Sequence, residues 1–210
     1  MKRVLAFDFG ASSGRAILAE YHGGRLAWEE VHRFDNLPRE QDGHLRWDFA
    51  GLMAQVYRGI EKAGRFDSVA FDTWGVDFGL LDETGRLLGD PVHYRDGRTA
   101  GMVEKALRTL DADALYAATG SQIMPINTLF QLLAVREQEP ETWGRAKRLL
   151  FMPDLFAHAL CGADACETTI ASTSQLLDAR AVGWSRQVLS AFALPETLVA
   201  PRVARGTGGG

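Results

Sequence analysis

An acid followed by a glycine- and serine-rich turn, near the start of the chain, is the first feature whose residue types could do chemistry. The stretch reads Asp8-Phe9-Gly10-Ala11-Ser12-Ser13-Gly14-Arg15. Small residues let the backbone approach a phosphate closely, and successive N–H groups can then converge on its oxygens. We predict phosphate binding by Ala11, Ser12, Ser13, Gly14 and Arg15. We also predict that Asp8 holds Mg²⁺ through water, because Mg²⁺ keeps much of its hydration shell.

That stretch has a plainer interpretation, which is a β-hairpin with a glycine-rich turn and no ligand. It is not a Walker A loop, because no Gly-Lys-Ser or Gly-Lys-Thr follows. It is not a dinucleotide-binding fingerprint either, because a strand and not a helix is expected next. The eight residues alone leave the two interpretations equally open.

A second stretch, Asp72-Thr73-Trp74-Gly75-Val76-Asp77, has the composition of a sugar pocket. Carboxylates accept hydrogen bonds from sugar hydroxyls, and an aromatic face covers C–H groups. Gly75 would let the backbone reach the ligand, and Asp77 would supply a carboxylate. The alternative is a turn between strands with Trp74 in the core.

Two later stretches add polar candidates to the same pocket. In His93-Tyr94-Arg95-Asp96-Gly97-Arg98-Thr99, Tyr94 and Arg95 are expected to face a polar ligand. Asp96 is expected to pair with an arginine, and Thr99 to cap the next helix. Asn127 is expected to be the N-cap of a helix, with the alternative that its amide reads a sugar hydroxyl.

The elements that must position these residues form an α/β layout. Apolar runs predict strands at residues 4–8, 15–21 and 25–34, joined so closely that they must be antiparallel neighbours. Helical spacing over 49–63 predicts a crossover helix, followed by strands at 68–73 and 78–82. The chain then becomes mostly helical, over 102–110, 113–119, 128–138, 153–160 and 185–192. We expect a mixed sheet that contains a three-strand meander and is flanked by helices.

Composition excludes several classes of function. A formal net charge of −4 disfavours nucleic acid as the main partner, because phosphate backbones require clustered Lys and Arg. The apolar run at residues 4–7 is too short for a signal peptide or a membrane span, so we expect a cytoplasmic protein without a membrane partner. The five histidines lack metal-ligand spacing, and no Gly-x-Ser-x-Gly occurs.

In combination, these motifs resemble the FGGY carbohydrate kinases. DFGASSGR, DTWGVDFGLLD and YRDGRT occur there in the same order and with similar spacing, and the resemblance runs from about residue 3 to about residue 177. Supporting segments are HRFDN, the pair Trp47-Asp48, NTLFQL from Asn127, and MPDLF from Met152. The resemblance implies an actin-like, ribonuclease-H-like fold in which ATP and sugar meet at a cleft. It implies transfer of the γ-phosphoryl group of MgATP to the 1-hydroxyl of L-rhamnulose, with ATP and Mg²⁺ as cofactors.

By position, Ala11 to Arg15 match the family's phosphate-binding hairpin and Asp8 its metal-facing acid. Gly75 matches a backbone contact to the sugar, and Asp77, Tyr94 and Asn127 fall in stretches that line the sugar pocket. Members of the family are more than twice as long, and their catalytic base is an aspartate that follows the first domain. No Asp occurs after Asp178.

We therefore expect residues 1–210 to be one N-terminal domain, with the base beyond Gly210 and the second, ATP-binding domain absent. This domain alone should be inactive, and its partner would be the missing C-terminal domain. Two alternatives stay open: a kinase for another ketose or for glycerol, and a non-catalytic sugar-binding regulatory module on the same fold.

Overall fold

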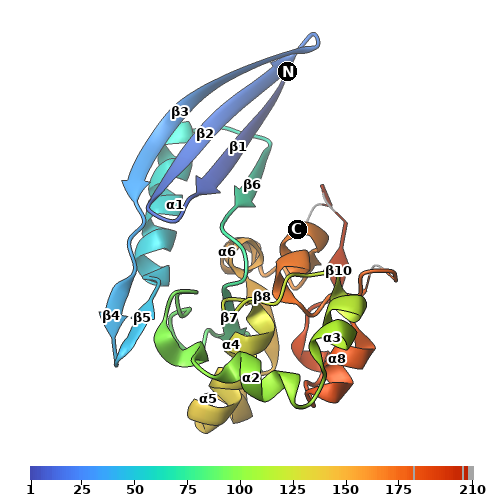
Figure 1. Cartoon of the computed structure of the whole chain (residues 1–210). Coiled ribbons are helices and arrows are strands. Elements are labelled where there is room, and N and C mark those ends of the chain that lie inside the picture. The colour runs from blue at the N-terminus through green and yellow to red at the C-terminus, as the bar shows by residue number, and fades with distance from the viewer. Residues whose placement is uncertain (182, 205, 208–210) are drawn as a thin grey trace. The chain divides into compact units, whose positions relative to one another are not determined.

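The structure is a computed structural model that describes residues 1–181, 183–204 and 206–207 (Figure 1). Its internal contacts divide the chain into two compact units. Unit 1 comprises Met1–Arg39 and Trp47–Trp74, and unit 2 comprises Glu40–Arg46 and Gly75–Gly210. Each unit is described separately below.

Unit 1 is built on a four-stranded sheet with the order β3-β2-β1-β6. Strands β1 (Lys2–Phe9), β2 (Ser13–His22) and β3 (Arg25–Asp35) form an antiparallel meander. Strand β6 (Ser68–Asp72) follows the crossover helix α1 (Phe49–Ala63) and pairs with β1 in parallel. The predicted meander, helix and mixed sheet are confirmed.

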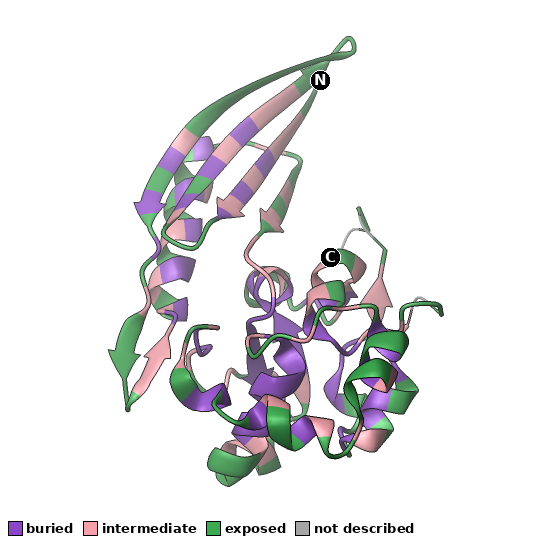
Figure 2. Ribbon diagram, viewed as in Figure 1, coloured by how far each residue is buried: buried purple, intermediate pink, exposed green. Residues whose placement is uncertain are grey.

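The core of unit 1 lies between this sheet and α1. Buried and less buried residues alternate along β1 and β2, as a sheet with one covered face requires (Figure 2). Leu5, Phe7 and Phe9 are buried on β1, and Leu52 and Val56 are buried on α1. The buried positions on α1 repeat every three to four residues, which is the pattern that predicted this helix.

Unit 2 combines small two-stranded sheets with short helices. The hairpin of β4 (Arg39–Gln41) and β5 (His44–Arg46) is one of them. Strand β7 (Phe78–Leu81) pairs antiparallel with β8 (Arg148–Phe151), and β9 (Cys166–Glu167) pairs in parallel with β10 (Arg202–Val203). The α-helices are α2 (Met102–Leu107), α3 (Ala112–Thr119), α4 (Thr128–Gln138), α5 (Pro140–Arg145), α6 (Met152–Cys161), α7 (Thr168–Ala171) and α8 (Arg186–Ala191). Short 3₁₀ turns occur at Gly97–Thr99, Ser172–Ser174 and Glu196–Leu198.

The β7–β8 pair forms the centre of unit 2. All four residues of β7 are buried, and β8 places the buried residues Leu149, Leu150 and Phe151 opposite the first three of them. The predicted strand at 78–82 is therefore present, and β8 is an element that the sequence analysis did not predict. Because Asp77 immediately precedes β7, this buried pair fixes the position of the predicted sugar pocket.

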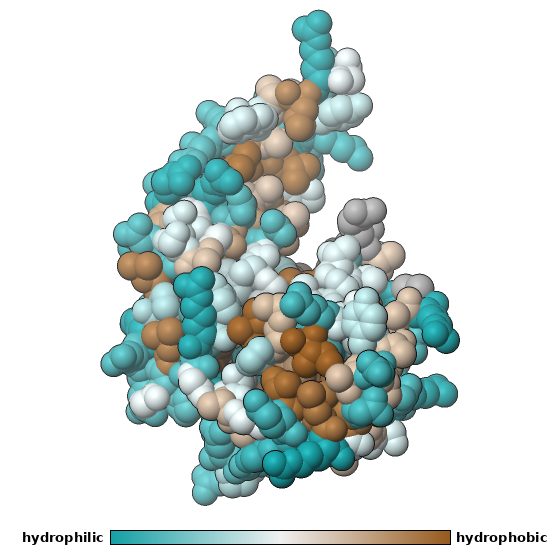
Figure 3. All heavy atoms as spheres, viewed as in Figure 1, coloured by the Kyte–Doolittle hydropathy of each residue, from teal (hydrophilic) through white to brown (hydrophobic). Residues whose placement is uncertain are grey.

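The surface shown in Figure 3 is mostly hydrophilic, with hydrophobic residues in smaller patches. No helix in the described part of the chain combines the length and the apolar composition that crossing a bilayer requires.

Candidate functional site

The predicted phosphate turn lies in unit 1 and connects β1 to β2. The Gly10 N–H donates to the Ser13 carbonyl at 2.8 Å, which closes the turn. Ala11 and Ser12 are exposed, and among the described residues no acceptor takes a hydrogen bond from either of their N–H groups. Two neighbouring backbone donors are thus presented at the surface, as an anion-binding turn requires.

Asn36 holds this turn from beneath, and the sequence analysis did not identify its role. The residue is buried, its side-chain amide donates to the Gly10 carbonyl at 2.7 Å, and its N–H donates to the Ser12 carbonyl at 3.0 Å. The turn is therefore pinned to the end of β3. Only the HRFDN segment of the resemblance pointed to this position.

Asp8 and Arg15 face each other across the same hairpin. They are paired in register, and the Arg15 Nε and Nη2 atoms donate to Asp8 Oδ2 at 2.8 and 2.6 Å. Both side chains are more than one third exposed, so the pair is open to exchange with ligands. The arginine predicted to bind phosphate and the carboxylate predicted to hold a hydrated cation thus lie side by side.

A second acid lies next to Asp8 on the neighbouring strand. In the parallel β1–β6 ladder Asp8 is opposite Asp72, and residues opposite one another point to the same face of a sheet. In the sequence, Asp72 belongs only to the predicted sugar motif. Among the described residues no three His, Cys, Asp or Glu side chains gather as in a direct metal site. Two carboxylates without a third ligand fit a cation that keeps most of its water.

Gly14 occupies a tightly packed position beneath the turn. It is buried, and a Cβ atom built on it would overlap ring atoms of Phe34, which is itself 7% exposed. The glycine is therefore required for packing between β2 and β3. Its predicted contact with phosphate would come from its backbone.

We expect Gly14→Ala to destabilise the chain by about 1–3 kcal/mol, the usual cost of overpacking a core. Phe34→Leu removes the ring that the new methyl group would meet, so the double variant should recover part of the loss. Urea unfolding of the parent, both single variants and the double variant gives the coupling energy. A Gly14→Ala loss that Phe34→Leu leaves unchanged would contradict this assignment.

The predicted sugar pocket lies in unit 2 and starts with a strained turn. Val76 has φ +67°, an uncommon value for a β-branched residue, and the Asp77 N–H donates to the Gly75 carbonyl at 2.9 Å. This is a γ-turn with positive φ, a rare and strained conformation. Thr173 Oγ1 accepts from the Val76 N–H at 3.0 Å, and the Thr128 hydroxyl donates to the Val76 carbonyl at 2.7 Å. The surrounding chain therefore holds the strained peptide on both sides.

Asp77 is fully buried and connects three of the predicted pocket stretches. Its Oδ2 atom accepts from the Tyr94 N–H at 3.1 Å, and its Oδ1 atom accepts from Gln131 Nε2 at 3.1 Å. Because both oxygens receive protein donors, Asp77 would act on a sugar through the groups that it orients. The structure thus brings Gly75, Asp77 and Tyr94 together around Gln131, on the helix that follows Asn127.

The Tyr94 ring has one aromatic and one cationic neighbour. Its ring stacks on His93 with centroids 4.3 Å apart, and the Arg95 guanidinium carbon lies 5.2 Å from its ring centroid. Burial, with the nearby positive charge of Arg95, lowers the pKa of His93 to about 4. Its Nδ1 atom accepts from the Arg95 N–H at 2.9 Å. Arg95 itself is exposed and lies outside the buried network.

Asn127 is at the N-cap position of α4, as predicted, but its side chain does not cap the helix. The amide nitrogen donates instead to the Gln122 carbonyl and to Gln175 Oε1, both at 2.8 Å. Asn127 is buried, so its amide joins distant segments of unit 2. Gln175 was missed by the sequence analysis because no motif extended to it.

Two further expectations for this region are wrong. Among the described residues Asp96 has no arginine side chain as its hydrogen-bonding partner: it accepts from the N–H groups of Leu45 and Arg98 and from His44. Thr99 does not cap the following helix, because α2 begins at Met102 with Gly101 at the N-cap. Asp96 anchors the loop to the β4–β5 hairpin through His44 and Leu45, a long-range contact that the local pattern of charges could not show.

Gly75 is also a packing position. A Cβ atom there would lie 2.9 Å from Thr173 Cγ2 and 3.1 Å from its Cβ. Thr173 cannot easily move away, since its hydroxyl donates to the Ile170 carbonyl and accepts from Val76. A larger residue at position 75 would therefore disturb the γ-turn, besides any effect on a ligand.

The chain is similar to a family of carbohydrate kinases and to named members of it. The profile of the "FGGY family of carbohydrate kinases, N-terminal domain" matches residues 3–208. The chain is 37% identical over 212 residues to a rhamnulokinase from Pectobacterium atrosepticum, and 39% identical over 211 residues to one from Enterococcus faecalis. These alignments cover 98% of the chain but only 43% and 42% of the two relatives, so the chain spans less than half of their length.

Solved structures support the same fold at lower identity. The ligand-bound xylulose kinase from Lactobacillus acidophilus matches 97% of the chain and 42% of its own, with a TM-score of 0.84 at 16% identity. The glycerol kinase from Plasmodium falciparum with ADP matches all of the chain and 44% of its own, with a TM-score of 0.84 at 15% identity. Together with the profile match, this establishes that the chain belongs to the N-terminal domain family of the FGGY carbohydrate kinases and has their actin-like fold.

Proposed function

We propose that this chain is the sugar- and phosphate-binding lobe of a cytoplasmic ATP-dependent kinase that phosphorylates L-rhamnulose at its 1-hydroxyl. The observation that carries the proposal is the buried network in which Asp77 orients the Tyr94 backbone and Gln131 next to a strained turn. Identities of 37–39% to two rhamnulokinases over nearly the whole chain favour L-rhamnulose among the sugars.

The phosphate end would be formed by the β1–β2 turn. We assign the ATP phosphates to the backbone of Ala11 and Ser12, with Ser13, Gly14 and Arg15 completing the site. Asp8, supported by Asp72, would hold Mg²⁺ through water, with Arg15 released toward phosphate. When bound, MgATP supplies the phosphoryl group and a cation that offsets its charge.

The sugar end would be formed by Gly75, Tyr94, Arg95 and Asn127 around Asp77. Tyr94 offers an aromatic face to the C–H groups of a sugar and Arg95 offers donors to its hydroxyls. The proton acceptor for the 1-hydroxyl is expected in the part of the relatives that lies beyond residue 210. The partner of this lobe would be that second domain.

A binding experiment tests the sugar assignment without requiring turnover. We expect Tyr94→Ala to weaken L-rhamnulose binding by about tenfold or more in calorimetry, because an aromatic face and an ordered loop are lost. Tyr116→Ala is the matched control, since Tyr116 is an exposed tyrosine on α3 and should leave binding unchanged. D-Xylulose and glycerol serve as competing ligands. A preference for either, or equal losses in both variants, would reject L-rhamnulose at this site.

A further inference from the structure

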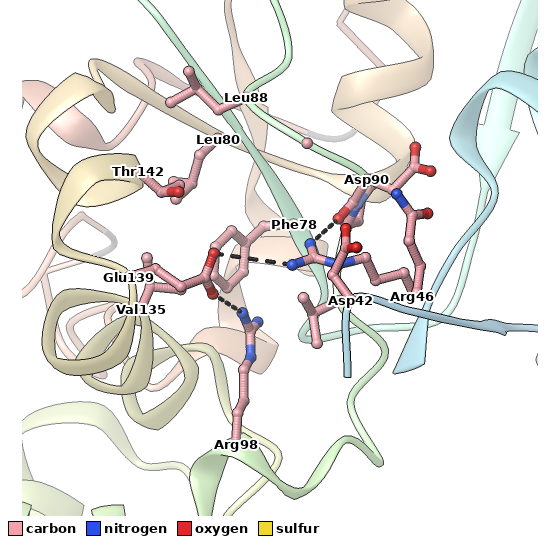
Figure 4. A pocket seen from close by; sticks show the side chains of 14 residues that line it. Asp42, Arg46, Phe78, Leu80, Leu88, Asp90, Arg98, Val135, Glu139 and Thr142 are labelled. Atoms are coloured by element: carbon pink, nitrogen blue, oxygen red, sulfur yellow. Dashed lines mark hydrogen bonds and ion pairs between the residues drawn. The ribbon is translucent and has the colours of Figure 1, made fainter. Parts of the chain in front are cut away.

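A cavity in unit 2 is not part of the phosphate turn or the sugar pocket. Its volume is about 190 Å³, and it lies between the β4–β5 hairpin, strand β7, the segment 88–92 and helices α4 and α5 (Figure 4). That volume corresponds to about six water molecules at their share of liquid volume, so it suits a ligand with few non-hydrogen atoms. None of the residues predicted for the sugar site lines it.

The cavity contains a carboxylate between two guanidinium groups. Figure 4 shows Arg46 and Arg98 both pointing toward Glu139. Arg98 Nη1 lies 3.6 Å from Glu139 Oε1, and Arg46 Nη2 lies 3.9 Å from Glu139 Oε2. Both distances are longer than hydrogen bonds, and within the described residues no protein group donates a hydrogen bond to this carboxylate.

Within the described part of the chain, the two arginines also have hydrogen-bond donors without an acceptor. The Nε atoms of Arg46 and Arg98 are buried and have no hydrogen-bond partner among the described residues. Unpaired buried donors and acceptors are costly, so groups of this kind are normally satisfied by a ligand or by ordered water. Donors and acceptors that lie side by side match a hydroxyl group, which both donates and accepts.

The remaining lining decides the charge and shape of the ligand. It includes three acids and two arginines, so a free anion would meet more negative than positive charge. Phe78, Leu80 and Leu88 supply an apolar wall beside the charged groups, and C–H groups of a sugar or polyol pack well on such a wall. We propose that this cavity is a second ligand site, which binds a small neutral polyol or monosaccharide.

Arg98 connects the cavity to Asp77 through Gln131. Arg98 Nη2 donates to Gln131 Oε1 at 2.7 Å, and Gln131 Nε2 donates to Asp77 Oδ1 at 3.1 Å. Gln131, Val135 and Glu139 follow one another at four-residue intervals along and just past α4, so they lie on one side of it. A ligand that fixes Arg98 also fixes the amide that orients Asp77. A ligand in the cavity should therefore act as a positive effector that strengthens sugar binding near Asp77. This consequence rests on the proposed sugar function.

Methyl NMR with xylitol as the probe tests the cavity. We expect saturable shifts of the Leu80, Leu88 and Val135 methyl groups with a Kd in the millimolar range, which is typical of a ligand with few contacts. Glu139→Gln should weaken this binding about tenfold, because a charged acceptor is lost. Leu88→Trp, which fills the cavity, should abolish it. Glu137→Gln is the matched control, since Glu137 lies two residues before Glu139 at the end of α4, is exposed and pairs with Lys105 outside the cavity.

Absence of saturable shifts at these methyl groups, up to concentrations on the order of 100 mM, would mean that only water fills the cavity and would overturn the proposal. So would equal binding by Glu139→Gln and Glu137→Gln. With xylitol bound, L-rhamnulose affinity should rise about fivefold, within the usual range of coupling between sites, and unchanged affinity would overturn the effector role. If xylitol shifts the cavity methyl groups while L-rhamnulose does not bind under any condition, the proposed sugar function fails and the cavity site stands.

Discussion

Residues 1–210 alone are expected to show no measurable phosphorylation of L-rhamnulose. Phosphoryl transfer requires the γ-phosphoryl group, the metal and the attacking hydroxyl to be held in line. This chain would contribute the proposed phosphate turn at the end of β1 and the proposed sugar pocket around Asp77. The general base is expected beyond this chain, and its loss alone would lower the rate by roughly 10²–10⁴-fold. Closure of the cleft and alignment of the reacting groups would be lost as well. These losses and the loss of the base affect the same transition state, so their effects on the rate need not add.

The measurement is a coupled ADP-release assay with the purified chain, MgATP and L-rhamnulose. The rhamnulokinase of Enterococcus faecalis, of which this chain matches 42%, serves as the active control under the same conditions. Turnover within about tenfold of that control, which corresponds to 1.4 kcal/mol of barrier, would show that the catalytic residues lie within this chain. Sugar binding without turnover is the expected outcome, because all the residues proposed for the sugar pocket lie in unit 2 of this chain.

Asp154→Asn is expected to stabilise the chain by about 4 kcal/mol at pH 8. Asp154 is buried at the start of α6, its Oδ2 atom has no hydrogen-bond partner among the described residues, and burial raises its pKa to about 7. A carboxyl group with a raised folded pKa contributes stability below its unfolded pKa of about 3.9 and loses it as the pH rises to about 7. Each pKa unit corresponds to about 1.36 kcal/mol. Asparagine has the shape of the neutral acid and removes this loss.

Urea unfolding of parent and variant between pH 4 and pH 8 measures the effect, and these pH values span nearly all of the window between the two pKa values. The difference between variant and parent should be near zero at the acid end and should grow toward pH 8. Buried His93, whose pKa is lowered to about 4, adds the opposite dependence, with stability lost as the pH falls from about 6.5 to 4. That contribution is common to both proteins and cancels in the difference. Asp113→Asn, on the exposed surface of α3, is the control, and equal effects of the two substitutions would refute the assignment.

Local features of the fold were predictable from the sequence. The β1–β2 turn and helix α1 occur where turn residues and helical spacing indicated, because both depend on neighbouring residues. Strand β8 was missed, since the short apolar run Arg148-Leu149-Leu150-Phe151 has no periodicity that separates a strand from a buried helix. Its partner β7 lies about seventy residues earlier in the chain, and no local sequence pattern predicts that pairing.

In the candidate site, too, the residues within local motifs could be predicted, whereas their contacts with distant residues could not. Gly75, Asp77, Tyr94 and Asn127 could be chosen by residue type within motifs. The structure joins Asp77 to Tyr94 and Gln131, whereas the Asn127 side chain bonds to Gln122 and Gln175. Their supporting residues could not be chosen in that way, because Thr173 reaches Val76 across 97 positions and Gln175 reaches Asn127 across 48. Arg98 looked like part of a solvated loop, yet it is 8% exposed because Gln131 and Glu139 surround it from another helix.

The division of the chain into units has a consequence for the order in which the protein can fold during synthesis. Neither unit is continuous, since the Glu40–Arg46 segment of unit 2 lies between two segments of unit 1. On the ribosome, where chains emerge from the N-terminus, the sheet of unit 1 can close once β6 has emerged. The β4–β5 hairpin must then wait for Asp96, to which His44 and Leu45 bond, and for Glu139, which Arg46 faces. A completed unit 1 would therefore carry, for the time needed to make the roughly 65 residues from Trp74 to Glu139 at 5–20 residues per second, an unpaired hairpin that belongs to unit 2.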